Sequence, residues 1–199
     1  MNARTSSGVY KTGFFAFLIG AVLIGALMGS VSYCFMDSDG YSKLTLFQNG
    51  YFSARQSGDF GEILIKSFSG ATLFMAAVFL MGFSAFGQPA VIAVLLIRGM
   101  GFGVTMAQFY SVYGKRGVLM SAVFVLPSAV ITTSALAAGA REAVGLSNLL
   151  LGITLSDRQE NGLRQAVRLY GAKFLVLEAV LAVGAGIECI CTVLFMGRL

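Results

Sequence analysis

The sequence lacks histidine and tryptophan, and it contains only two prolines and three cysteines. Without an imidazole, the chain excludes His-ligated metal sites and hydrolases that use a Ser-His pair. Three cysteines are too few for a zinc site made of thiolates alone, and they form no disulfide framework. Charged residues make up 12% of the chain, whereas a soluble protein has about a quarter. We therefore predict no enzymatic activity, no metal and no cofactor.

Long apolar stretches dominate the sequence. Apolar residues make up 57% of the chain, and its mean hydropathy is +0.82. A bilayer core about 30 Å thick requires about 20 helical residues per crossing. We therefore predict an all-α, polytopic integral membrane protein in which a single membrane domain covers residues 1–199. It has about five transmembrane helices, at residues 13–36, 67–87, 89–113, 117–140 and 174–196.

The orientation in the membrane follows from lysine and arginine in the short loops. With the N-terminus inside, the cytoplasmic side holds one more of these residues than the outer side. We therefore expect the N-terminus inside and the C-terminus outside. Residues 37–66 then form an outer loop, and residues 141–173 form a cytoplasmic segment. Pro89 is expected at a helix start after a tight hairpin, and Pro127 is expected to kink the fourth span.

Small residues recur at four-residue spacing in the first and third spans. Gly25 and Gly29 lie on one face of the first span, and Gly99 and Gly103 lie on one face of the third. Small residues at this spacing let membrane helices approach closely. We predict that these faces pack inside the bundle, in preference to a homodimer contact.

Three ionisable residues fall within the apolar spans: Arg98, Glu178 and Glu188. At 1.5 Å of rise per residue, Arg98 lies between the two glutamates in depth. We expect one of the glutamates to be its partner in an ion pair that fixes helix orientation, and the alternative is a proton-relay role. The glycine-rich run Arg98–Gly103 lacks the strand and spacing of a phosphate loop, so we predict no nucleotide binding.

The outer loop combines aromatic residues with polar ones. Tyr41, Phe47, Tyr51 and Phe52 are candidates for docking a partner protein. Farther along, Phe60, Ile63 and Leu64 have helical spacing. The end of the loop is therefore expected to form a contact surface or a short helix on the outer leaflet.

The cytoplasmic segment ends in a basic amphipathic stretch. Apolar side chains from Leu163 to Phe174 share one helical face, and Arg158, Arg164 and Arg168 lie elsewhere. This pattern favours contact with anionic lipid, and a partner groove is the competing use. No nucleic acid or small-molecule substrate is predicted as a binding partner.

The order of several short motifs resembles a known family. Leu80-Met-Gly-Phe-Ser-Ala-Phe-Gly-Gln-Pro89 is followed by Arg98-Gly-Met-Gly-Phe-Gly103, then by Tyr113-Gly-Lys-Arg-Gly117 and Val125-Leu-Pro127. This order resembles the stage II sporulation protein M family of endospore-forming Gram-positive bacteria. The resemblance covers about a third of the chain, and the specificity lies in the order and spacing of the motifs.

The resemblance implies a non-enzymatic scaffold in the cell membrane. Such a protein would gather membrane-anchored peptidoglycan hydrolases at the sporulation septum during engulfment. The alternative is the permease subunit of a transporter driven by a separate cytoplasmic ATPase. Cys34 would lie toward the outer leaflet with Cys189 and Cys191, so a disulfide from Cys34 to either is left open.

Overall fold

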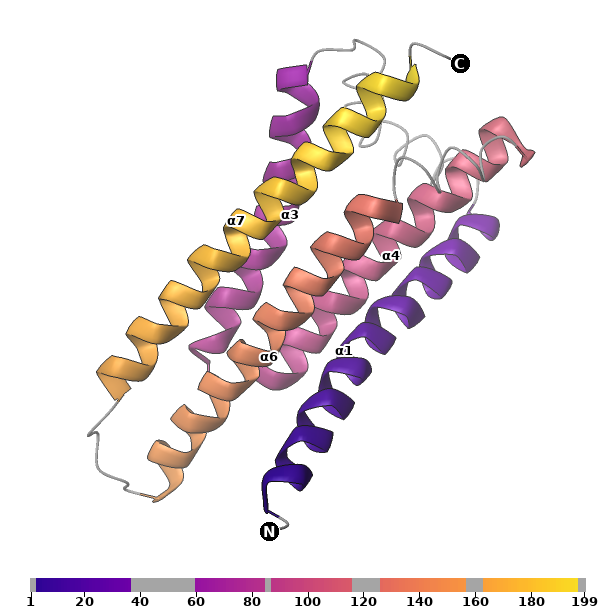
Figure 1. Cartoon of the computed structure of the whole chain (residues 1–199). Coiled ribbons are helices and arrows are strands. Elements are labelled where there is room, and N and C mark those ends of the chain that lie inside the picture. Colours follow the sequence, from indigo (N-terminus) through magenta and orange to yellow (C-terminus); the bar gives the residue numbers. More distant parts are fainter. Residues whose placement is uncertain (1–2, 37–59, 85–86, 116–125, 157–162, 197–199) are drawn as a thin grey trace.

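Five helices make up the part of the chain that the structure describes. This computed structural model describes residues 3–36, 60–84, 87–115, 126–156 and 163–196. Its helices are α1 (Ala3–Cys34), α3 (Phe60–Gly82), α4 (Gly87–Tyr113), α6 (Leu126–Ser156) and α7 (Leu163–Met196). They run alternately up and down, so that α1 begins at one end of the bundle and α7 finishes at the other (Figure 1).

Four of these helices are long and apolar enough to cross a membrane: α1, α3, α4 and α7. Their outward-facing side chains are also apolar, as at Leu27, Leu73 and Leu175, which are 69%, 70% and 75% exposed. In lipid, apolar side chains can cover the outside of a helix whose backbone hydrogen bonds are satisfied internally. The predicted class, an all-helical polytopic membrane protein, is confirmed.

Helix α6 is the one described helix that is not apolar enough to count as a candidate span. It contacts each of the other four helices and lies among them (Figure 1). Its inner surface consists mainly of small buried residues such as Ala137, Ala140 and Ala143. A helix that is covered by other helices needs small side chains for close packing more than large lipid-facing ones.

The helix ends differ from the predicted span limits because several helices continue past their apolar stretches. Helix α3 begins at Phe60 and α7 at Leu163, so the expected surface helices are continuous with the spans. Ile63 packs on Cys189, and Tyr170 packs in the main core. These amphipathic ends therefore have helix partners to cover their apolar faces, and they extend the bundle.

The fourth predicted span, 117–140, also has different limits. Its first residues, 117–125, lie outside the described residues, and α6 continues past Arg141 to Ser156. Pro127 lies in the first turn of the described helix, where the missing N–H of proline does no harm. The hairpin before α4 is longer than expected, since α3 ends at Gly82 and α4 begins at Gly87.

The most extensive helix contact joins α1 and α4, which run in the same direction. A Cβ atom added at Gly25 would overlap the carbonyl oxygen of Leu96, and one added at Gly29 would overlap that of Met100. The two backbones therefore touch without intervening side chains. Contacts of this kind let Cα–H groups face carbonyl oxygens across the helix pair.

The glycines of α4 make the reciprocal contact. A Cβ atom at Gly99 or Gly103 would overlap the carbonyl oxygen of Val22 or Ala26 on α1. The Ser30 hydroxyl lies within hydrogen-bond distance of the carbonyl oxygens of Ala26 (3.0 Å) and Gly103 (3.1 Å). All four glycines singled out in the sequence thus lie in one intramolecular interface.

Aromatic side chains join α3 to α7 near the end of the bundle where α3 ends and α7 begins. The Tyr170 hydroxyl donates a hydrogen bond of 3.0 Å to the carbonyl oxygen of Phe79. The ring of Tyr170 lies 5.1 Å from that of Phe79 and 4.6 Å from that of Phe174, between centroids. The hydroxyl occupies the space beside Gly82, where a Cβ atom would overlap it. The face predicted from Leu163 to Phe174 therefore packs on α3.

Candidate functional site

Glu188 on α7 is a buried carboxyl group at the meeting point of three helices. It is 5% exposed. The hydroxyl of Ser67 on α3 donates to its carboxyl at 2.5 Å, and that of Ser128 on α6 donates to it at 2.8 Å. Hydrogen bonds to a carboxylate are roughly twice as strong as neutral ones. The three residues therefore tie α3, α6 and α7 together inside the bundle.

The cysteines of the described residues are all free thiols. Cys189 is buried next to Glu188. Its thiol donates a hydrogen bond of 3.3 Å to the carbonyl oxygen of Phe60. Cys34 is exposed and Cys191 is half-buried. Cys189 therefore acts as a small packing residue between α7 and the start of α3.

Arg98 on α4 is half-buried beside two aromatic rings. Its guanidinium carbon lies 5.0 Å from the ring centroid of Phe74 on α3 and 4.5 Å from that of Phe102. A guanidinium over an aromatic face is stabilised by a cation–π interaction. Pairing of Arg98 with Glu178 or Glu188 remains a prediction.

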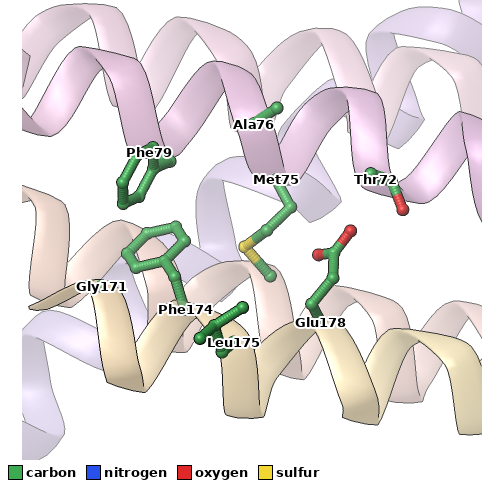
Figure 2. Close-up of a pocket in the computed structure, with 8 residues that line it drawn as sticks. All are labelled: Thr72, Met75, Ala76, Phe79, Gly171, Phe174, Leu175 and Glu178. Atoms are coloured by element: carbon green, nitrogen blue, oxygen red, sulfur yellow. The ribbon is translucent and has the colours of Figure 1, made fainter.

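Glu178 occupies different surroundings from Glu188, although both belong to α7. It lines a groove of about 370 Å³ between α3 and α7, with Met75, Phe174 and Leu175 along it (Figure 2). Its carboxyl group points toward Thr72 at one end of this groove. The Thr72 hydroxyl is buried and has no hydrogen-bond partner among the described residues.

The groove is almost wholly apolar apart from Thr72 and Glu178. An ionised carboxyl at the centre of a membrane-spanning helix costs at least ~2.5 kcal/mol. In the described part of the chain, no hydrogen bond or ion pair with Glu178 offsets this cost. Glu188, by contrast, has its two hydroxyl donors.

The predicted basic residues of α7 lie at the end of the bundle where α1 begins. Arg164 and Arg168 are exposed in the first turns of α7, and Arg158 lies outside the described residues. Lys173 makes an ion pair of 2.6 Å with Glu142 on α6. This end of the α6–α7 hairpin presents positive side chains that face away from the core.

The predicted docking aromatics, Tyr41, Phe47, Tyr51 and Phe52, lie outside the described residues. Their role stays a prediction. Within the described ranges, no three His, Cys, Asp or Glu side chains gather where they could hold a metal ion.

Three functional-site residues carried no expectation from the sequence: Ser67, Ser128 and Thr72. Each is a hydroxyl residue within or beside an apolar stretch, which is the signal that could have drawn attention to them. Serine and threonine are common in membrane helices, because the hydroxyl can donate a hydrogen bond to a backbone carbonyl oxygen of its own helix. Thr132 and Ser134 do so through the carbonyl oxygens of Ser128 and Val130.

The family model described as Stage II sporulation protein M matches residues 13–193. The matched stretch includes the α1–α4 interface, the Glu188 cluster and the α3–α7 groove. No curated protein and no solved structure matches the chain.

Proposed function

We propose, from the premise that this chain belongs to the stage II sporulation protein M family, that it is a non-enzymatic scaffold of the cell membrane. Its role would be to gather peptidoglycan-degrading partners at the sporulation septum of a Gram-positive bacterium during engulfment. Family membership carries the sporulation-related membrane role. The recruiting role is the proposal.

The geometry that favours a scaffold is the way two interior polar groups, Glu188 and Arg98, are used, whereas Glu178 lines the apolar α3–α7 groove. Glu188 receives hydrogen bonds from two neighbouring helices, and the guanidinium of Arg98 lies near the rings of Phe74 on α3 and Phe102 on its own helix. A transport path would instead require polar groups that face a water-filled route. Polar groups that hold helices together favour a bundle of fixed shape.

The partner surface in this proposal is the outer loop, because peptidoglycan hydrolases act outside the cytoplasmic membrane. Tyr51 and Phe52 are adjacent in that loop. Aromatic side chains supply much of the binding energy at protein interfaces, because they bury large areas at low entropic cost.

The test is an in-cell crosslink followed by a pull-down of the tagged full-length protein in mild detergent, from growing and from sporulating cells. We expect extracytoplasmic peptidoglycan hydrolases in the sporulating sample. Changing both Tyr51 and Phe52 to alanine should lower their recovery about tenfold or more, since loss of two aromatic anchors exceeds 1.4 kcal/mol.

The matched control changes both Arg164 and Arg168 to glutamine, at the end of the bundle where α1 begins. This variant should retain hydrolase recovery at unchanged protein level. Failure to recover any hydrolase with the original protein would refute the recruiting role. Recovery of a cytoplasmic ATPase that depends on Arg164 and Arg168 would instead identify a permease subunit.

A further inference from the structure

The α3–α7 groove, lined by Thr72, Met75, Phe79, Phe174, Leu175 and Glu178, has its polar end near the middle of two candidate membrane spans. Glu178 is central in the candidate span Leu163–Thr192, and Thr72 is central in the candidate span Ile63–Gly82. The two residues belong to antiparallel helices and face each other across the groove (Figure 2). Both helices therefore give the same depth for this pair.

The depth of Glu178 limits what can bind there. The hydrocarbon core is about 30 Å thick, so lipid headgroups lie about 15 Å from its centre. An acyl chain can fill the apolar length of the groove, but it offers no hydrogen-bond donor to the carboxyl group of Glu178. A basic side chain on a membrane-spanning helix can supply a donor at this depth.

The shape of the groove also suits a helix. Its rim includes Gly171 and Ala76, and a Cβ atom added at Gly171 would meet no atom within 4 Å. Small residues let a second helix approach closely. Leu175 and Val176 beside it are 75% and 64% exposed, so an apolar helix face finds an apolar surface there.

We propose that the α3–α7 groove binds a transmembrane helix of a partner protein, whose mid-span lysine or arginine pairs with Glu178. The charge is the argument for a basic residue, because intramembrane carboxylates pair with basic groups. The proposal deepens the scaffold function and rests on it, since a membrane-anchored partner brings such a helix.

The test places a photo-crosslinking amino acid at Leu175 of the full-length protein in sporulating cells. Mass spectrometry of the adduct should identify a partner peptide from a transmembrane segment with a lysine or arginine near its middle. Glu178→Lys should lower the adduct yield about tenfold or more, and exchanging the partner's basic residue for glutamate should restore it.

Two further variants keep the test independent of folding. Glu178→Gln removes the charge with little change of shape and should also reduce the adduct. Gly171→Leu fills the groove and should abolish it, whereas Gly101→Leu on α4, where an added Cβ also meets nothing, should leave it unchanged.

The outcomes separate this proposal from the scaffold function. Adducts with phospholipid alone, with a second copy of this chain, or with a helix that lacks a basic residue would overturn the groove assignment. If hydrolases are still recovered in the pull-down, the scaffold function survives that loss. A basic transmembrane helix from a protein unrelated to peptidoglycan, without hydrolase recovery, would support the groove and refute the scaffold.

Discussion

Gly103 lies in the close contact between α1 and α4. The carbonyl oxygen of Ala26 occupies the space that a side chain at position 103 would need. Without a hydrophobic driving force between helices in lipid, such close packing is a main source of association. Gly101, two residues earlier on the same helix, is exposed and meets no neighbour at its Cβ position. The pair offers a clean comparison of one residue type in two environments.

We expect Gly103→Leu to destabilise the protein by about 3 kcal/mol, because the two backbones must separate to admit the side chain. The matched variant Gly101→Leu should leave stability within about 1 kcal/mol of the original. The measurement is the fraction of folded protein after heating in detergent, followed by gel filtration of a fluorescently tagged chain, since the sequence contains no tryptophan. Equal losses in both variants would contradict the close contact.

The hydroxyl of Ser128 makes a second residue-scale prediction. Ser128→Ala removes a donor to Glu188 and should cost about 1 kcal/mol or slightly more. Ser134→Ala is the control, because that hydroxyl is exposed and bonds only to its own helix, at Val130. In a double-mutant cycle with Glu188→Gln, measured by the same heating experiment, Ser128 should show coupling and Ser134 none.

At the scale of elements, α6 is the helix on which the others assemble. Its alanines Ala137, Ala140 and Ala143 are fully buried, and its opposite face includes the exposed Gly145. The ion pair between Glu142 and Lys173 also joins it to α7, but both side chains are partly exposed, at 29% and 44%. Screening by solvent makes such a pair weak.

We therefore expect packing, and not the ion pair, to dominate the α6 contacts. Ala137→Leu should destabilise by about 2 kcal/mol through overpacking, whereas Gly145→Leu on the same helix should be neutral or mildly stabilising. Glu142→Gln should change stability by less than about 1 kcal/mol. Thermal stability in detergent checks all three, and a larger effect of Glu142→Gln than of Ala137→Leu would refute this ranking.

The sequence predicts the helices well, and their ends and azimuths poorly. Twenty apolar residues suffice to indicate a span, but they do not tell whether the adjoining amphipathic turns from Phe60 or Leu163 lie on lipid or on another helix. Depth along a helix follows from residue number, so Arg98 could be placed midway. The direction in which a side chain points around the helix does not follow from residue number. The sequence therefore does not predict that the guanidinium lies near the rings of Phe74 and Phe102.

The glycine spacing likewise predicts close contact without naming the partner. Gly25 and Gly29 face α4, and which helix they face depends on how all the helices pack together. The clustering of Ser67, Ser128 and Glu188 from three helices is of the same kind. It depends on tertiary arrangement and leaves no periodic pattern in any one segment.

At the scale of the whole molecule, the described helices place Cys34 and the first turns of α7 at opposite ends of the bundle (Figure 1). With the N-terminus inside, the end that carries Cys34 faces outward. Cys189 is buried and Cys34 is exposed, so thiol reagents should distinguish them.

A membrane-impermeant maleimide should therefore label Cys34 in intact cells, and Cys34→Ser should remove most of the signal. In that background, Gln165→Cys, at an exposed position near the start of α7, should react only after the cells are opened. Labelling of Gln165→Cys in intact cells, together with no labelling of Cys34 in the original chain, would show the opposite orientation.

The pairing of α1 with α4 has a consequence for the order of synthesis. α1 is made first, yet the helix that covers its glycine face follows only after α3 is complete. Most contacts of α3 are likewise with α6 and α7, which emerge later still. A growing chain that has reached Gly82 thus holds α1 and α3, whose main partners among the described helices have not been translated. The nascent protein must be held in the membrane as separate helices, and assembly can finish only when the ribosome has delivered the last one.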